Sequence, residues 1–150
     1  MNKFNPIYNA RKATLSDVMF FYESINTTVD LTLNINDFDS IFKSKLKVKY
    51  NQLIVLIDQQ GNAAGCAIIE FRTAITDVFQ FCEIQHFYIH PKYRKHAAAE
   101  ALYQEIELAA TTKKCFKISV SSLLNATINQ RFYTKRGFKL IKKTYLKTVI

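Results

Sequence analysis

The stretch Phe87-Tyr-Ile-His-Pro-Lys-Tyr-Arg-Lys-His-Ala-Ala-Ala-Glu-Ala-Leu102 decides the predicted fold of this chain. Its aromatic and β-branched residues predict a strand that ends before Pro91, and its alanine-rich part predicts a helix. The first N–H groups of a helix lack intrahelical acceptors and carry about half a positive charge, so they favour anions. Lys92, Arg94 and Lys95 lie beside this helix start. The stretch therefore predicts a pyrophosphate-binding loop, and a solvated basic turn before a packed helix is the alternative that it leaves open.

On either side of this stretch, the spacing of apolar residues predicts a series of strands and helices. We expect strands at 7–13, 53–57, 63–73, 79–90, 115–120 and 138–147, and helices at 14–25, 36–49, 97–110 and 126–135. The order β-α-α-β-β-β-α-β-α-β begins with antiparallel hairpins and continues with strand–helix–strand crossovers. It predicts the α/β class, as an α+β mixed sheet with helices on both faces, in a single domain over residues 1–150.

Local signals support several of these boundaries. Thr14 is a predicted N-cap, and Asp17 three residues later completes a capping pattern. The segment 58–62 has the composition of a hairpin turn. Gly137 is positioned to end the last helix.

Composition excludes several classes of protein. The chain has 150 residues, 49% of them hydrophobic, which is typical of one folded domain. No apolar run approaches the ~20 residues of a membrane helix, and the first residues lack a signal-peptide core. Cys66, Cys82 and Cys115 form no C-x-x-C pair, so we interpret them as small buried hydrophobes. His86 and His90 are about 13 Å apart along a strand, too far to share one metal ion. We expect a cytoplasmic protein without a metal site.

The net charge of +9 is distributed unevenly. Residues 1–90 hold 8 basic and 9 acidic side chains, a net charge of −1, whereas residues 91–150 hold 13 and 3, a net charge of +10. A surface that binds a polyanion is therefore expected in residues 91–150. Nucleic acid, an anionic cofactor and an acidic substrate are all compatible with this charge.

A second block, residues 125–138, reads Asn-Ala-Thr-Ile-Asn-Gln-Arg-Phe-Tyr-Thr-Lys-Arg-Gly-Phe. Tyr133 follows Phe132 on a predicted short helix, four residues before Gly137. A tyrosine hydroxyl can donate a proton to a departing thiolate. By itself, the pair is better explained as aromatic packing.

Together the two blocks resemble the GNAT superfamily of N-acetyltransferases. Members of that family have a V-x-P-x-x-R-like bend, a loop of the form Arg/Gln-x-x-Gly-x-Gly/Ala that opens a helix, and a later Phe-Tyr-x-x-x-Gly-Phe. The matching segments here are 89–94, 94–99 and 132–138. Ala97 and Ala99 replace the two loop glycines of the family. Alanine still allows close approach to the backbone, but it is disfavoured at positive φ. Gly65 is similar to the family's third-strand glycine, and the element order matches over nearly the whole chain.

The resemblance implies transfer of an acetyl group from acetyl-CoA to a primary amine of a small molecule or peptide, by direct attack in a ternary complex. It implies pairing of the pantetheine arm with the backbone of the strand end, and a pyrophosphate site in the loop. The cofactor-binding residues would then be Phe87, Tyr88, Ile89, Arg94, Lys95, His96, Ala97, Ala98 and Ala99. Asn125 is a further candidate contact, with Asn129 as its alternative.

The same resemblance assigns the catalytic roles. Tyr133 is the candidate general acid, and Glu83 is the first candidate base, with Glu70 or a water as alternatives. Glu83-Ile-Gln before His86, together with the closing segment 137–147, looks most like the small-amine branch that contains aminoalkylphosphonate and aminoglycoside acetyltransferases.

Two other functions remain as hypotheses. The chain could be a non-catalytic GNAT-like module that binds acyl-CoA or a protein partner, because Ala97 replaces a loop glycine. It could also be a nucleic-acid binder, but its basic residues are spread over several elements and match no nucleic-acid motif. We therefore expect no nucleic-acid or membrane partner, and the sequence leaves open whether the chain forms a homodimer.

Overall fold

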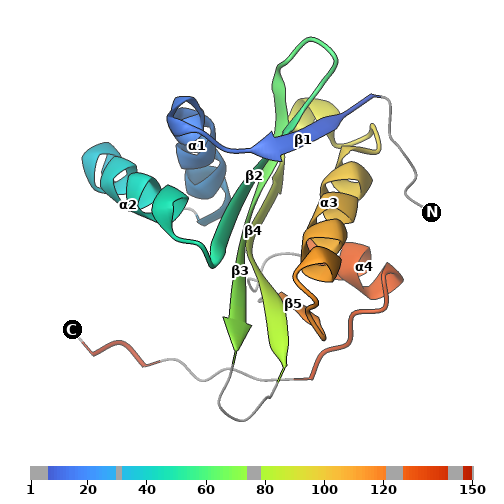
Figure 1. The fold of residues 1–150 in the computed structure, drawn as a ribbon. Helices are drawn as coiled ribbons and strands as arrows, with labels where there is room; N and C mark the ends of the chain where they lie inside the picture. Colours follow the sequence, from blue (N-terminus) through green and yellow to red (C-terminus); the bar gives the residue numbers. More distant parts are fainter. Residues whose placement is uncertain (1–6, 30–31, 74–78, 121–126, 142–146, 150) are drawn as a thin grey trace. The chain divides into compact units, whose positions relative to one another are not determined.

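The computed structural model of the chain describes residues 7–29, 32–73, 79–120, 127–141 and 147–149. The chain divides into two compact units, Met1–Val120 and Ser121–Ile150. Figure 1 labels the elements. The strands are β1 (Asn9–Lys12), β2 (Asn51–Ile57), β3 (Ala63–Thr73), β4 (Gln80–Ile89) and β5 (Ile118–Val120). The helices are η1 (Leu15–Asp17), α1 (Val18–Val29), α2 (Ile35–Lys47), η2 (Pro91–Tyr93), α3 (Ala98–Thr112) and α4 (Thr127–Lys135).

The sheet lies entirely within the first unit and has the order β1-β2-β3-β4-β5. Its first four strands pair antiparallel, and β5 joins β4 in parallel after the α3 crossover. The predicted mixed α+β sheet is therefore confirmed.

The strand predicted at 138–147 is not found in the described residues of this segment. Residues 138–141 and 147–149 form no strand, and 142–146 lie outside the described residues. Leu140 is 89% exposed and Ile141 is 79% exposed, so these side chains provide no buried face to hold a strand at 138–141.

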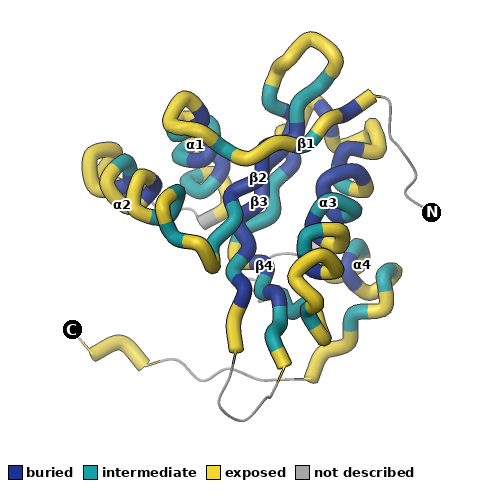
Figure 2. Tube along the Cα trace, in the orientation of Figure 1, coloured by how far each residue is buried: buried dark blue, intermediate teal, exposed yellow. Residues whose placement is uncertain are grey.

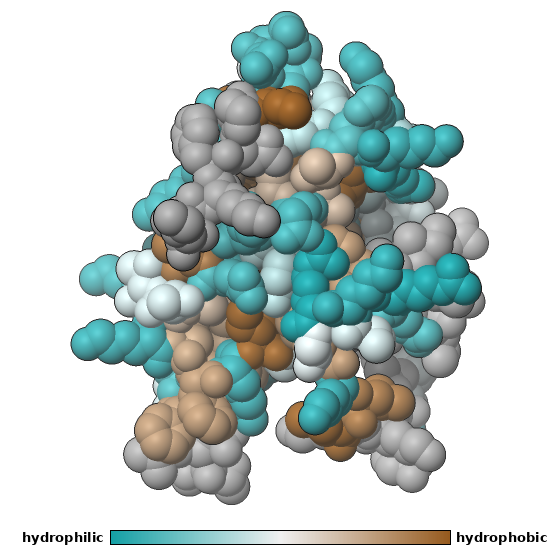
Figure 3. All heavy atoms as spheres, turned by 90° about the vertical axis from the view of Figure 1, so that its right-hand side faces the viewer, coloured by the Kyte–Doolittle hydropathy of each residue, from teal (hydrophilic) through white to brown (hydrophobic). Residues whose placement is uncertain are grey.

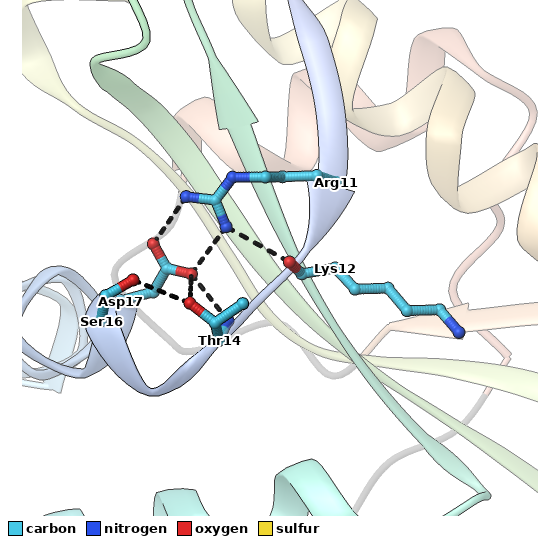
Figure 4. Close-up of polar contacts among 5 residues, drawn as sticks. All are labelled: Arg11, Lys12, Thr14, Ser16 and Asp17. Atoms are coloured by element: carbon cyan, nitrogen blue, oxygen red, sulfur yellow. Dashed lines mark hydrogen bonds and ion pairs between the residues drawn. The ribbon is translucent and has the colours of Figure 1, made fainter.

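An ion pair fixes the corner between β1 and α1. The buried carboxylate of Asp17 accepts hydrogen bonds from both terminal nitrogens of Arg11, at 2.7 and 2.9 Å, and from the Thr14 N–H at 2.8 Å (Figure 4). The predicted helix start at Thr14 is correct, although its first turn is the 3-10 helix η1. Burial opposes ionisation of Asp17, but the hydrogen bonds from Arg11 and Thr14 outweigh it and lower the pKa of the carboxyl.

We expect Asp17→Asn to destabilise the fold by about 1.5–3 kcal/mol at pH 7, since hydrogen bonds to charged groups contribute that much. Because the pKa of Asp17 is lower in the folded state, its contribution is fully present above the unfolded-state pKa and is lost as the pH falls through the folded value. The difference between wild type and variant should therefore shrink as the pH falls below the ordinary carboxyl value of 3.8. Urea unfolding at several pH values measures it, and a difference that does not depend on pH would contradict this assignment.

One face of the sheet is covered by α1 and α2 (Figure 1). Its core contains buried residues from both helices and from β2 and β3, shown dark blue in Figure 2. They are Phe21, Phe38, Phe42, Leu53, Val55, Cys66 and Ile68. The side chains of β3 alternate between the faces. Glu70, two residues beyond Ile68, therefore lies on this same face.

Helix α3 packs on β3 and β4. Leu102 and Ile106 of α3 are fully buried, as are Ile54 and Ile69 of the sheet. The side chains of Ile54 and Ile69 alternate with those that face α1 and α2, so α3 covers the opposite face.

The cysteines are free thiols. Cys66 and Cys82 are buried as expected, whereas Cys115 is only half-buried because it follows the end of α3. Among the described residues, no group of three or more His, Cys, Asp or Glu side chains could hold a metal ion. No helix in the described part of the chain combines the length and apolar character needed to cross a membrane.

Candidate active site

The end of β4 lies unusually close to β3. A Cβ atom on Gly65 would be 2.7 Å from the Tyr88 carbonyl oxygen and 2.8 Å from Ile89 Cδ1, so only glycine fits opposite this strand end. The pairing continues past the strand, since the His90 N–H donates to the Ala64 carbonyl at 2.9 Å. Gly65 therefore fixes the position from which the following loop departs.

Three side chains anchor the loop between β4 and α3. His90 Nδ1 accepts the Lys92 N–H at 3.2 Å. The buried Tyr93 donates its hydroxyl to Asp58 in the β2–β3 turn at 2.6 Å. Arg94 Nε donates to the Ile89 carbonyl at 3.1 Å. The loop is thus tied to the strand before it and to the neighbouring hairpin.

The loop ends on Ala97, which has φ 56° and ψ 10° in the left-handed region and acts as the N-cap of α3. Arg94, Lys95, His96 and Ala97 are exposed, Ala98 is buried and Ala99 is half-buried. The N–H groups of Ala98 and Ala99 begin the helix, so no intrahelical carbonyl can accept them. In Figure 1, α3 begins on the right of the view, below the level of the β2–β3 hairpin, and Figure 3 shows many hydrophilic side chains over the upper part of the face that it presents. Free helix N–H groups and adjacent cations fit a diphosphate.

We expect Ala97→Gly to stabilise the protein by about 0.5–1 kcal/mol, because the left-handed conformation costs a non-glycine residue about 1–2 kcal/mol. The matched control is Ala98→Gly, which removes a buried methyl group at negative φ and should destabilise by a similar amount. Urea unfolding of both variants measures the effects. If the two alanines changed stability in the same direction, the left-handed loop end would be wrong.

The predicted pantetheine-binding residues form the end of β4. The register pairs Ala67 with Phe87, Cys66 with Tyr88 and Gly65 with Ile89. The described ladder between β4 and β5 covers only Cys82 to Ile84. The Tyr88 ring packs edge-on against Phe20 of α1, at 6.1 Å between centroids, so it stabilises the α1 side of the sheet.

The candidate bases are part of one ion-pair network. Glu70 and Glu83 are cross-strand partners, so both lie on the face covered by α1 and α2. Arg72 Nη1 donates to Glu83 Oε2 at 2.7 Å, and Arg72 Nε lies 3.4 Å from Glu70 Oε1. Gln85 Nε2 donates to Glu70 Oε2 at 2.6 Å. Two carboxylates share one guanidinium, which leaves a net charge of about −1 that favours an ammonium ion.

His86 is a half-buried polar residue for which the sequence suggested no role. Ile68 pairs with His86 and Ile69 pairs with Ile84, so Gln85 forms a bulge in β4. His86 Nε2 lies 2.9 Å from the hydroxyl of Ser24, which is fully buried in α1. Burial lowers the pKa of His86 to about 4, so the ring is neutral at pH 7. The bulge could not be read from the sequence, because alternation alone predicts regular pairing.

The second unit contains the candidate acid. Tyr133 is 5% exposed on α4, and its ring packs against Phe132 and Phe138. Burial raises the pKa of its hydroxyl above the ordinary value of 10.0, so the group stays protonated at pH 7. Gly137 follows the helix with φ 88°, as predicted for its C-terminal end. Asn125 lies outside the described residues, and Asn129 is part of α4.

Comparison with known proteins identifies the family. The profile of the Acetyltransferase (GNAT) domain matches residues 49–140, which include the β4–α3 loop, both candidate carboxylates and Tyr133. The chain belongs to the GNAT acetyltransferase family. Members of this family are acyl-CoA-dependent N-acetyltransferases, so the chain is assigned to that class of enzyme. No curated protein matches the sequence at a significant level.

Solved structures share the GNAT fold at low sequence identity. A transcriptional regulator from Bacillus halodurans C-125 has a TM-score of 0.83 at 20% identity, over 94% of this chain and 99% of that one. An aminoglycoside 6'-N-acetyltransferase from Acinetobacter baumannii has a TM-score of 0.79 at 14% identity, over 95% and 99%. The aminoglycoside acetyltransferase AAC(6')-Iy, in complex with a CoA-containing bisubstrate analogue, also has a TM-score of 0.79 at 14% identity, over 94% and 97%.

Proposed function

We propose that this GNAT protein transfers an acetyl group from acetyl-CoA to a primary amine of a small molecule or peptide, by direct attack within a ternary complex. The observation that carries the proposal is the loop end at Ala97. It keeps the left-handed conformation that favours glycine, and the exposed Arg94 and Lys95 stand beside the first N–H groups of α3. An alanine held in a disfavoured conformation at a helix start supports a binding function for this loop.

In this proposal the loop residues hold the donor. The N–H groups of Ala98 and Ala99 bind the pyrophosphate, with Arg94, Lys95 and His96 around it. The backbone of Phe87 to Ile89 binds the pantetheine arm. The thioester supplied by acetyl-CoA then lies alongside β4.

The carboxylates of Glu83 and Glu70 attract the acceptor as an ammonium ion. An alkyl amine has a pKa of ~10.4, so it must lose a proton before it can attack. Glu83 accepts that proton directly or through a water. A fitting acceptor is a small amine, consistent with the aminoglycoside acetyltransferases among the structural neighbours.

The second proton transfer of the reaction is from Tyr133 to the leaving group. The departing thiolate has an intrinsic pKa of ~8.5 and leaves more readily when it receives a proton. The buried phenol stays protonated over the physiological range and therefore has a proton to donate.

Acetyl-CoA should stabilise the protein by about 2.7 kcal/mol at 100 times its Kd. For a chain of this length that corresponds to a rise in melting temperature of roughly 5–10 °C. Arg94→Gln/Lys95→Gln should weaken the shift, whereas Lys43→Gln/Lys114→Gln removes the same charge elsewhere and should preserve it. The measurements are thermal unfolding with increasing acetyl-CoA, and release of free CoA with a panel of small primary amines.

These measurements distinguish the proposed acetyltransferase from the non-catalytic acyl-CoA-binding module. A shift with turnover on an amine supports the proposal. A shift without turnover on any amine favours the non-catalytic acyl-CoA-binding module, which is motivated by the unusual Ala97. The absence of any shift at millimolar acetyl-CoA would reject both.

A further inference from the structure

A polar cavity of the first unit is lined by residues of β1, α2, β2, β3 and the end of α3. It has a volume of about 370 Å³ and opens where β1 ends, α2 ends and β2 begins. Its described lining contains five lysines and no acidic residue: Lys12, Lys45, Lys47, Lys49 and Lys113. Four of them come from residues 1–90, the part of the chain with a net charge of −1. The fold has therefore gathered a positive site that the charge distribution along the sequence did not predict.

The lysines are not neutralised within the described part of the chain. None of the five forms an ion pair with a described carboxylate, whereas Lys43, one turn earlier on α2, pairs with Asp39 at 2.6 Å. Figure 4 shows Lys12 extending away from the neighbouring Arg11–Asp17 pair. The Lys113 ammonium lies 5.7 Å from the centroid of the Phe71 ring. The cavity thus carries a charge of about +5 at pH 7.

Stabilisation of helix ends accounts for only part of this charge. Lys45 and Lys47 lie in the last turn of α2, and Lys113 caps the end of α3. Each helix C-terminus contributes about −0.5 charge, so two of them offset about one lysine. An excess of roughly +4 remains. Lysines that only complemented the helices would not need Lys12 and Lys49 as well.

The lining also contains an unsatisfied polar atom. Asn51 Oδ1 is buried and has no hydrogen-bond partner among the described residues. A buried acceptor without a partner costs free energy, and a protonated phosphate oxygen or a hydroxyl group of a bound molecule would satisfy it. The volume of about 370 Å³ is near the lower end of the range for small-molecule sites.

We propose that this lysine-lined cavity binds a small molecule that carries two or more phosphate groups. Lysine ammonium groups act as compact point charges, and several of them around one cavity match the closely spaced negative charges of a polyphosphate. A cavity of this size holds a compact anion rather than an extended nucleic acid.

This site is distinct from the proposed acetyl-CoA site and does not depend on it. The β4–α3 loop lies at the start of α3, and Lys113 lies at its end (Figure 1). Fifteen helical residues separate the two ends, a length of about 22 Å. One small anion cannot occupy both positions.

Titration calorimetry with inorganic tripolyphosphate, in the presence of saturating CoA, tests the proposal. We expect one bound tripolyphosphate per chain. Lys45→Gln/Lys49→Gln should weaken its binding by about 10-fold, since each charge contact contributes up to about a 5-fold change. The control Lys43→Gln/Lys114→Gln removes the same number of positive charges, one on α2 and one just after α3, without altering the lining, and should change the affinity less than 2-fold. Citrate should bind at least 10-fold more weakly than tripolyphosphate.

Lysine labelling localises the site whether or not CoA binds. Bound tripolyphosphate should protect Lys45, Lys47 and Lys49 from an amine-reactive reagent, as read by mass spectrometry, and should leave Lys43 reactive. Protection confined to Lys92 and Lys95 would mean that only the loop site exists. Absence of binding, equal weakening in both double variants, or equally tight binding of citrate would each overturn the proposal.

Discussion

Tyr133→Phe should lower kcat by 10²- to 10⁴-fold, the usual contribution of a general acid, while the KM for acetyl-CoA changes little. The hydroxyl acts only as the thiolate departs, so its loss raises the barrier without weakening ground-state binding. The phenylalanine ring keeps the packing against Phe132 and Phe138. The measurement is steady-state release of CoA with an amine that supports turnover.

The pH profile gives a second readout of the same residue. Burial raises the pKa of Tyr133, so the hydroxyl stays protonated above pH 10. The wild-type rate should therefore show no alkaline loss from this group up to about pH 10. Tyr103→Phe is the matched control, because Tyr103 is also buried and donates its hydroxyl to Glu107 at 3.2 Å on α3. Equal kcat values for Tyr133→Phe and wild type would remove Tyr133 from the mechanism.

Glu83→Gln is the second substitution with a large expected effect. It keeps the shape of the side chain but removes the charge that attracts the ammonium and the lone pair that accepts its proton. We expect kcat/KM for the amine to fall by 10²- to 10⁴-fold, with little change in the acetyl-CoA affinity. The Arg72 guanidinium would lose its bond to a charged Glu83 oxygen but keep its contact with Glu70.

Glu70→Gln is the matched comparison, since it removes the same charge from the cross-strand partner. If Glu83 is the base, Glu70→Gln should lower kcat/KM by no more than about 10-fold, through weaker attraction of the amine. A larger loss in Glu70→Gln than in Glu83→Gln would exchange their roles. Small and equal losses in both would leave a water as the base.

The fold class was predictable from sequence because its signals are local. The apolar run at 53–57, the hairpin turn at 58–62 and the alanine-rich helix after the basic loop each encode one element and its neighbour. The ends of strands are harder to predict from sequence, because pairing with a neighbouring strand can extend them. β2 begins at Asn51 because it pairs with Glu70, and the tail at 138–141 is not a strand, although its residues favour one.

The sequence also predicted the loop from Arg94 to Ala99, since a helix start next to basic residues is a contiguous pattern. It could not predict that Glu70 and Glu83 share Arg72, because that depends on the register between β3 and β4. The bulge that brings His86 to Ser24 depends on the same register.

The positions of the charged residues show most clearly what the sequence determined and what the tertiary structure determined. The sequence by itself determined that the basic residues after Pro91 surround a helix start. Only the tertiary structure brought Lys12, Lys45, Lys49 and Lys113 to one cavity, because α2, β2 and the end of α3 meet where β1 stops. Electrostatic fields depend on distance in space, so residues far apart in the chain act together only after folding.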